Sequence, residues 1–162
     1  GAIWFFIKLI GTSAGIDSTQ VGVALGVSTG VATLGALAAA GLADRIGRII
    51  PVTVALLVQV VMIWLLQGEM SFLQFMLTAA IFQTFWNLNG PYIMGTIALS
   101  DTTGRVSLLI PTAQIGGFFL GPVIAGQMLT PGAGYGPANT LAIACCLLAL
   151  AIFIPVAMRL KR

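Results

Sequence analysis

Apolar residues occur in this chain as long runs between short charged clusters. Charge-free runs cover 18–43, 49–68, 70–100 and 106–158. A helix that crosses a bilayer needs about 20 mostly apolar residues, so each run can supply at least one. The last run can supply two, because the glycines and prolines of T-P-G-A-G-Y-G-P at 130–137 break helices. The pattern predicts complete spans near 20–43, 50–67, 71–98, 106–129 and 138–158.

The first residues, G-A-I-W-F-F-I-K-L-I, are apolar but too few to cross a bilayer. We interpret 1–12 as the outer end of a helix whose beginning is missing, and the chain as a fragment. The segment has no basic leader with a cleavage site, so it does not read as a signal peptide. The predicted fold class is all-α, with residues 1–162 forming one helical bundle in the membrane.

Composition supports a membrane protein. The chain is 59% apolar and only 7% charged, whereas soluble domains carry roughly 25% charged residues. The adjacent Cys145 and Cys146 lie inside the last predicted span, and the sequence has no histidine. We therefore interpret both cysteines as small packing residues and expect neither a metal site nor a cofactor.

The basic residues predict the orientation. By parity of the predicted spans, six of the seven share one side, and these are Arg45, Arg48, Arg105, Arg159, Lys161 and Arg162. The positive-inside rule places them in the cytoplasm and leaves Lys8 near the other surface. We expect a multi-pass protein of the plasma membrane, most simply a bacterial inner membrane, with loops 44–48 and 99–105 and the C-terminus cytoplasmic. This charge balance needs no nucleic-acid partner.

Small residues divide the spans into two kinds. Lipid is as apolar as the side chains, so helices associate where small residues let their backbones approach. Spaced glycines and one proline mark the spans at 20–43 and 106–129, and they are Gly22, Gly26, Gly30, Gly117, Gly121 and Pro122. The spans at 50–67 and 138–158 contain no glycine. We expect the first pair to pack and the second pair to face lipid; the alternative is that the glycine spacing arises by chance.

The span at 71–98 carries amides near the predicted bilayer midplane. Gln83 and Asn87 are one helical turn apart on one face. An unpaired amide in hydrocarbon costs several kcal/mol, so this face should look into the bundle or into water. Transporters place substrate sites at this depth. The candidate substrate-binding residues are Gln83, Asn87, Lys8, Trp4 and Gln114. Hydrogen bonding between helices is the alternative for the amides, and snorkelling to the interface for Lys8.

Other polar groups in the spans point to no enzyme. Ser28, Thr29 and Thr33 fit hydrogen bonds back to their own helix carbonyls. The four acidic residues fall between predicted spans, so a buried carboxylate for proton coupling is not among these residues. The sequence has no glycine-rich phosphate loop and no nucleophile beside a base, and we predict that the protein is not an enzyme.

The segment A-G-L-A-D-R-I-G-R at 40–48 resembles the cytoplasmic hairpin motif of the major facilitator superfamily, G-x-L-a-D-r-x-G-r-(K/R). Asp44 matches the acid, Arg45 and Arg48 the basic residues, and Gly47 the turn glycine. The first glycine of the motif is alanine here, and the final basic residue is isoleucine. Such decay is usual in the second copy of the motif in this family. In physical terms, Gly47 permits the positive φ of a tight turn.

The resemblance covers essentially the whole chain and implies the C-terminal half of a twelve-helix transporter, from the end of helix seven through helix twelve. It implies that helices eight and eleven line the interface between halves, that nine and twelve face lipid, and that seven and ten line the cavity. The implied partners are a small-molecule substrate, the lipid bilayer and the missing N-terminal half. Residues 116–126 also partly resemble an antiporter signature, from which no direction of transport follows.

The sequence D-T-T-G-R at 101–105 repeats the pattern D-x-x-G-R of 44–48. We hypothesise that Asp44, Asp101 and Arg105, with the arginines of the first loop, form a cytoplasmic latch that closes in the outward-open state. The alternative is that both loops only turn the chain and fix its topology.

The leading functional prediction is a secondary active transporter that moves a small solute by alternating access. The alternatives are a multidrug-type exporter of the same fold, a non-transporting membrane receptor or scaffold, and a small homo-oligomeric channel or carrier.

Overall fold

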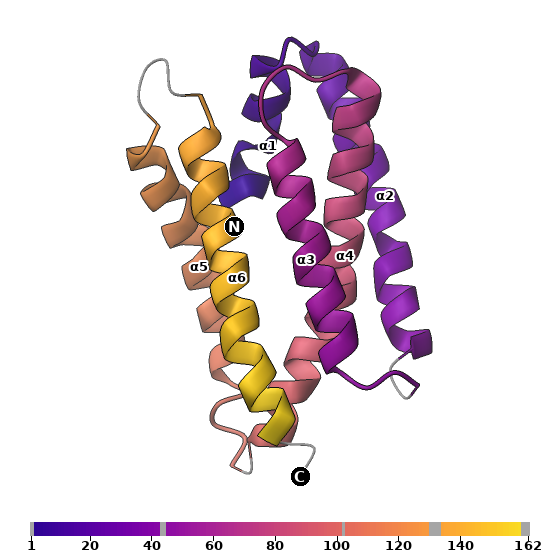
Figure 1. Ribbon diagram of the computed structural model, residues 1–162, viewed down its shortest axis with the longest axis vertical. Helices are drawn as coiled ribbons and strands as arrows, with labels where there is room; N and C mark the ends of the chain where they lie inside the picture. Colours follow the sequence, from indigo (N-terminus) through magenta and orange to yellow (C-terminus); the bar gives the residue numbers. More distant parts are fainter. Residues whose placement is uncertain (1, 43–44, 102, 130–133, 160–162) are drawn as a thin grey trace.

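The computed structural model describes residues 2–42, 45–101, 103–129 and 134–159, and Asp44 lies outside them. Every regular element in these ranges is a helix, which confirms the all-α prediction (Figure 1). The helices are α1 (Ala2–Ser13), α2 (Ser18–Leu42), α3 (Ile49–Leu65), α4 (Phe72–Ser100), α5 (Leu109–Gln127) and α6 (Gly136–Arg159).

Three of these helices, α2, α5 and α6, are long and apolar enough to cross a membrane. Helix α3 has 17 residues, so it is about 25 Å long at 1.5 Å per residue, slightly short of a typical hydrocarbon core. Helix α4 has 29 residues but carries several amides within its apolar sequence. Helix α1 is short, with 12 residues, as its sequence predicts. The observed helices therefore follow the predicted segmentation closely, while only three meet the length and hydropathy of a span.

The helices pack as a chain of neighbours. Helix α2 packs along α4, α4 along α3, and α3 along α6, while α1 contacts α2, α5 and α6. Figure 1 shows α5 and α6 side by side at one edge of the bundle and α2 at the other. Helix α3 consequently lies between α4 and α6.

Helix α3 has one buried face and one exposed face. Its buried side chains are Pro51, Val52, Ala55, Leu56, Gln59 and Ile63. Side chains at this spacing form ridges that fit the grooves of a facing helix without any glycine. Its exposed side chains are Ile50, Val54, Leu57, Val61 and Trp64, so an apolar face of α3 is open as well. Helix α6 buries only Ala138, Asn139 and Ala157. That the glycine-free helices face lipid stays a prediction.

The glycines of α2 differ in how closely a neighbouring helix approaches them. A Cβ at Gly22, Gly26 or Gly30 would meet no atom within 4 Å, because α4 lies against another face of α2. The close approach occurs at Gly35, where a Cβ would overlap the carbonyl oxygen of Thr84 and come within 3.1 Å of the Leu88 amide nitrogen. Within this chain the close approach of α2 to a neighbour therefore falls at Gly35, and the packing of the first three glycines against another helix stays a prediction.

Helix α5 shows one of its two predicted packing glycines in use. A Cβ at Gly121 would lie 3.1 Å from the backbone nitrogen of Ala2, so this glycine lets α1 and α5 approach. Gly117 has open space around it, and the helix runs on through Pro122. Helix α5 buries only Ala125, so most of its surface is free.

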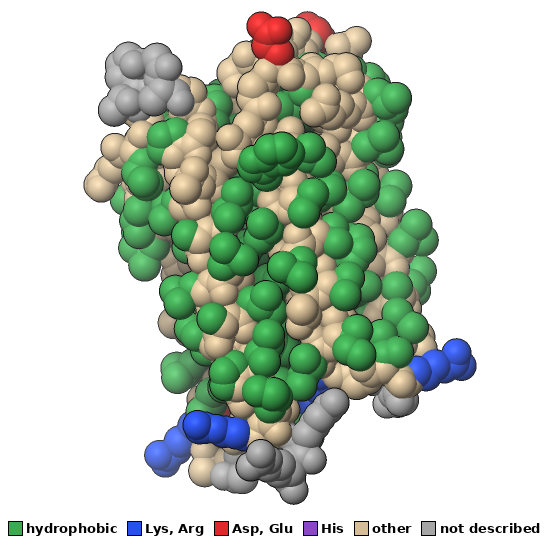
Figure 2. Space-filling view, viewed as in Figure 1, with side chains coloured by type: hydrophobic (Ala, Val, Ile, Leu, Met, Phe, Trp, Pro, Cys, Tyr) green, Lys and Arg blue, Asp and Glu red, His purple; other side chains and the backbone are tan. Residues whose placement is uncertain are grey.

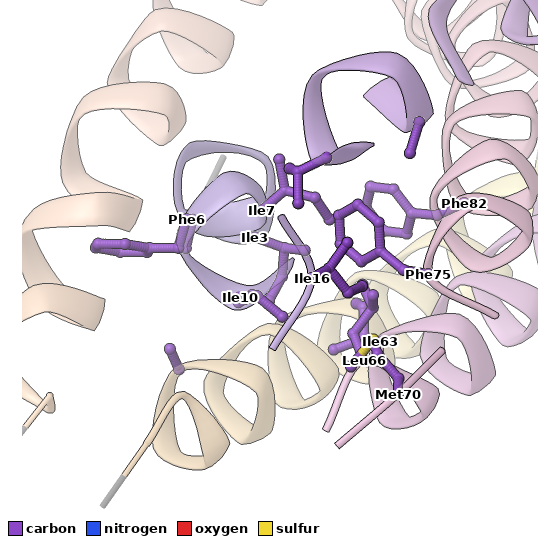
Figure 3. Close-up of a cluster of buried hydrophobic side chains, with 14 of the residues drawn as sticks. Ile3, Phe6, Ile7, Ile10, Ile16, Ile63, Leu66, Met70, Phe75 and Phe82 are labelled. Atoms are coloured by element: carbon purple, nitrogen blue, oxygen red, sulfur yellow. The ribbon is translucent and has the colours of Figure 1, made fainter. Parts of the chain in front are cut away.

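The main core lies around α1. Buried side chains of α1, including Ile3, Ile7 and Ile10, meet Ile63 and Phe75 from α3 and α4. Figure 3 shows the labelled α1 isoleucines facing these side chains, whereas Phe6 points toward α5. A second, smaller cluster consists of Ala39, Val52, Leu56 and Tyr92, and in it the Tyr92 hydroxyl donates to the Ala39 carbonyl at 3.4 Å. Helix α4 is thus anchored at both ends, with its amide-bearing middle between the two clusters.

Charged side chains gather at the two ends of the bundle. In Figure 2 the visible basic side chains lie at the lower end and acidic side chains stand at the upper end, with a largely apolar surface between them. The loops at the lower end carry Arg45, Arg48 and Arg105, and we call it the arginine end. Asp17 and Glu69 belong to the loops at the opposite end.

Candidate functional site

The middle of α4 presents one mixed face. Gln83, Trp86, Asn87 and Gly90 are spaced i, i+3, i+4 and i+7, so they share a side of the helix. Both amides are half-buried, and the Asn87 Nδ2 donates to the Gln83 carbonyl at 3.0 Å. The structure therefore keeps the two predicted residues together on one face, with Trp86 between them.

A proline adds a backbone acceptor to this face. Pro91 lies inside α4 and has no N–H, so the carbonyl of Asn87 lacks its helical donor four residues later. In an apolar environment such a carbonyl is tolerated where it meets another polar group or lines a cavity. The α4 face can thus offer both a side-chain amide and a carbonyl at the same level.

Aromatic rings connect α4 with α5. Trp86 stacks on Phe82 of its own helix, with ring centroids 6.4 Å apart and an interplanar angle of 27°. Its ring also meets Phe118 of α5 at 6.4 Å and 58°. Gln114 lies one turn before Phe118 and is exposed. The predicted residue Gln114 therefore belongs to a helix that reaches the α4 face through Phe118.

The two candidates on α1 have different surroundings. Trp4 is half-buried and packs against the main core, whereas Lys8 is exposed on the surface of the helix. The Lys8 carbonyl accepts a hydrogen bond from Thr12 Oγ1 at 3.1 Å, so α1 is locally regular there. Trp4 has a packing role in this structure, and the part that either residue plays toward a solute remains a prediction.

The hairpin at 44–48 turns at its glycine and is tied to α4. Gly47 has φ of +64°, in the left-handed region that favours glycine, as its place in the motif predicts. The Arg48 Nη1 donates to the Gly95 carbonyl at 2.8 Å in a partly buried contact. Arg45 is exposed. Arg48 therefore fixes the start of α3 against α4 near the arginine end.

The second D-x-x-G-R loop turns in the same way but uses its acid differently. Gly104 has φ of +74°. The Asp101 carboxylate accepts hydrogen bonds from the Thr103 amide at 3.2 Å and hydroxyl at 3.1 Å and from the Ser107 amide at 2.7 Å. The Ser107 bond is the main reason that the pKa of Asp101 lies below its usual range. Asp101 thus holds its own loop in this conformation, and Arg105 is exposed.

Buried amides outside the predicted site escaped the sequence analysis. Asn139 of α6 is fully buried, and its Nδ2 donates to the Leu66 carbonyl at 2.8 Å, which closes the end of α3. Gln59 and Asn89 are also buried, and the Gln59 Nε2 and Asn89 Oδ1 have no hydrogen-bond partner among the described residues. The sequence signal for Gln59 was an isolated amide within an apolar run.

The hydroxyl groups of α2 behave as their helical positions predict. Ser28 donates to Ala24 at 2.6 Å, Thr29 to Leu25 at 2.9 Å and Thr33 to Gly30 at 2.8 Å, in each case to the carbonyl oxygen. These bonds satisfy the hydroxyls within the helix, so α2 needs no polar partner at these positions.

One hollow lies away from the α4 face. A depression of about 440 Å³ at the end opposite the arginines is lined by residues that include Ser13, Leu66, Glu69 and Tyr135. Within the described ranges no three His, Cys, Asp or Glu side chains come together as a metal site would require.

Comparison with known proteins adds no relative. No family model, curated protein or solved structure matches the chain.

Proposed function

We propose that the chain is the C-terminal half of a secondary transporter of the major facilitator type, which moves a small solute by alternating access. The observation that carries this proposal is the half-buried amide face of α4, at Gln83 and Asn87, on the same helix that Arg48 ties to the hairpin at Gly95. Substrate sites of such transporters lie at mid-membrane depth on discontinuous helices, and Pro91 removes one backbone hydrogen bond from α4 at this level.

The unused glycines of α2 support a second half. Gly22, Gly26 and Gly30 form an exposed strip of small residues, which is the surface that a closely packed membrane helix requires. We propose that a helix of the N-terminal half covers this strip. The arginine end would then be cytoplasmic and the protein would lie in the plasma membrane, in accordance with the positive-inside rule.

Alternating access is tested at Asn87 in the full-length protein. In a background with Cys145 and Cys146 replaced by alanine, an Asn87→Cys variant should react with a membrane-impermeant thiol reagent from both sides of sealed vesicles. Crosslinking the two halves of the transporter at one end should abolish labelling from that side alone. The control is Ile81→Cys, because Ile81 lines an apolar groove with Val27 and Val31 of α2 and should stay unlabelled.

The same assay distinguishes a transporter from a non-transporting receptor or scaffold of the same fold. In a receptor or scaffold, position 87 is accessible from one side of the membrane at most. Asn87→Cys would then react from one side only, whichever end of the protein is crosslinked. That outcome would contradict the proposed function.

The latch is tested by Asp44→Asn and Arg48→Gln. Arg48→Gln removes the charge-assisted bond to the Gly95 carbonyl, and such bonds contribute about 1.5–3 kcal/mol. Labelling at position 87 from the cytoplasmic side should therefore rise several-fold in both variants. Arg159→Gln, at the end of α6, serves as the control and should leave the ratio of labelling from the two sides unchanged. If Asp44→Asn leaves this labelling ratio unaltered, the latch hypothesis is wrong. The hairpin would then only turn the chain and fix its topology.

A further inference from the structure

We propose that Trp86 is the stacking platform of the solute site and that the solute is a planar, uncharged aromatic compound with N–H or O–H donors. This inference rests on the proposed function and names the substrate class of the same site.

The surroundings of Trp86 hold its ring without covering it. The ring is stacked on Phe82 from the preceding turn and meets Phe118 from α5, and Trp86 is still 42% exposed. A tryptophan fixed between two rings loses little freedom when a further ring stacks on it, which reduces the entropic cost of binding. Offset or tilted aromatic arrangements of this kind are also favourable beyond their buried area.

The polar groups beside Trp86 include several acceptors. The Asn87 Nδ2 gives one of its two N–H groups to the Gln83 carbonyl, and the Oδ1 can accept a hydrogen bond. Pro91 leaves the Asn87 carbonyl without its helical donor, and Pro122 does the same for the Phe118 carbonyl. Both residues flank Trp86, one on its own helix and one through the ring contact. A solute that carries donors at its edge would pair with these oxygens.

The charge distribution selects an uncharged solute. A tryptophan face also attracts organic cations, and sites that bind them usually add a carboxylate. All four acidic residues, Asp17, Asp44, Glu69 and Asp101, fall in the sequence between the described helices. The helices that supply Trp86 and its ring neighbours, α4 and α5, contain no acidic and no basic residue, so they place no charge of either sign beside the solute.

The test uses Trp86 as its own reporter. In the full-length protein with every other tryptophan replaced by phenylalanine, 4-nitroaniline should quench Trp86 emission saturably. This probe is planar, uncharged and carries N–H donors. N,N-dimethyl-4-nitroaniline lacks the donors. Its concentration at half-saturation of quenching should be about fivefold higher, which is the factor that one hydrogen bond contributes. Phe118→Ala should weaken quenching by 4-nitroaniline several-fold while the circular dichroism spectrum stays unchanged.

The control is the matched protein that keeps Trp64 as its only tryptophan. Trp64 is exposed on α3, so it reports partitioning of the probe into the surrounding apolar phase and should show linear quenching. Equal, non-saturating quenching at Trp86 and Trp64 would overturn the proposal. Tighter binding of 4-nitrobenzyl-trimethylammonium, a cationic probe, would overturn the assignment to uncharged solutes. Either failure, if position 87 still shows alternating access, leaves the transporter proposal standing.

Discussion

Replacing Gly35 with alanine is expected to lower the free energy of unfolding by about 3 kcal/mol, the upper part of the usual range for overpacking. The added Cβ would overlap the Thr84 carbonyl oxygen and lie 2.9 Å from the carbonyl carbon. These are backbone atoms, so no rotamer change relieves the overlap and α2 must move away from α4. The measurement is the thermal unfolding midpoint in detergent, followed by circular dichroism.

The matched control for Gly35 is Gly41→Ala in the same helix. A Cβ at Gly41 meets no atom within 4 Å, and alanine is favoured over glycine in a helix by about 0.5–1 kcal/mol. Gly41→Ala should leave the midpoint unchanged or raise it slightly. Equal midpoints for the two variants would show that α2 and α4 are farther apart than the structure has them.

Replacing Gln59 with methionine is expected to stabilise the protein by about 2 kcal/mol, which is the cost of a buried donor left without a partner. Gln59 is 1% exposed, and its Nε2 finds no acceptor among the described residues. Methionine has nearly the same length and fills the same space between α3 and its neighbours, so packing is retained. The unfolding midpoint should therefore rise.

The control for Gln59 is Gln67→Met, because Gln67 is exposed in the loop between α3 and α4. Its amide is solvated, so this substitution should have no measurable effect. A lower midpoint in Gln59→Met would mean that the Nε2 has a partner, such as a bound water, and that the bond to it stabilises the fold.

The sequence was most informative where a property depends on local chemistry. Gly47 takes a positive φ because a tight turn requires it, and the hydroxyls of Ser28, Thr29 and Thr33 bond to their own helix because their neighbours in sequence provide the acceptors. The helix boundaries fall within a few residues of the predicted spans for the same reason. Charged and helix-breaking residues end an apolar run wherever that run packs.

The candidate site was predictable only in part. The amides at 83 and 87 share a face by helical geometry alone, so the sequence could pair them. It could not bring Phe118 of α5 to Trp86, because that contact depends on how two distant helices cross. Nor could it identify Asn139 as the residue that closes the end of α3, since 73 positions separate the donor residue from its acceptor.

By itself, the sequence of this protein determined the all-helical fold, the apolar segments, the turns and the separation of charge between the two ends. Only the tertiary structure decided which faces meet: α2 approaches α4 at Gly35 and leaves Gly22, Gly26 and Gly30 open, and the glycine-free α3 packs between α4 and α6. The physical reason is that apolar side chains satisfy lipid and protein neighbours equally well. Composition therefore places a helix in an apolar environment, but shape complementarity between whole surfaces selects its partner.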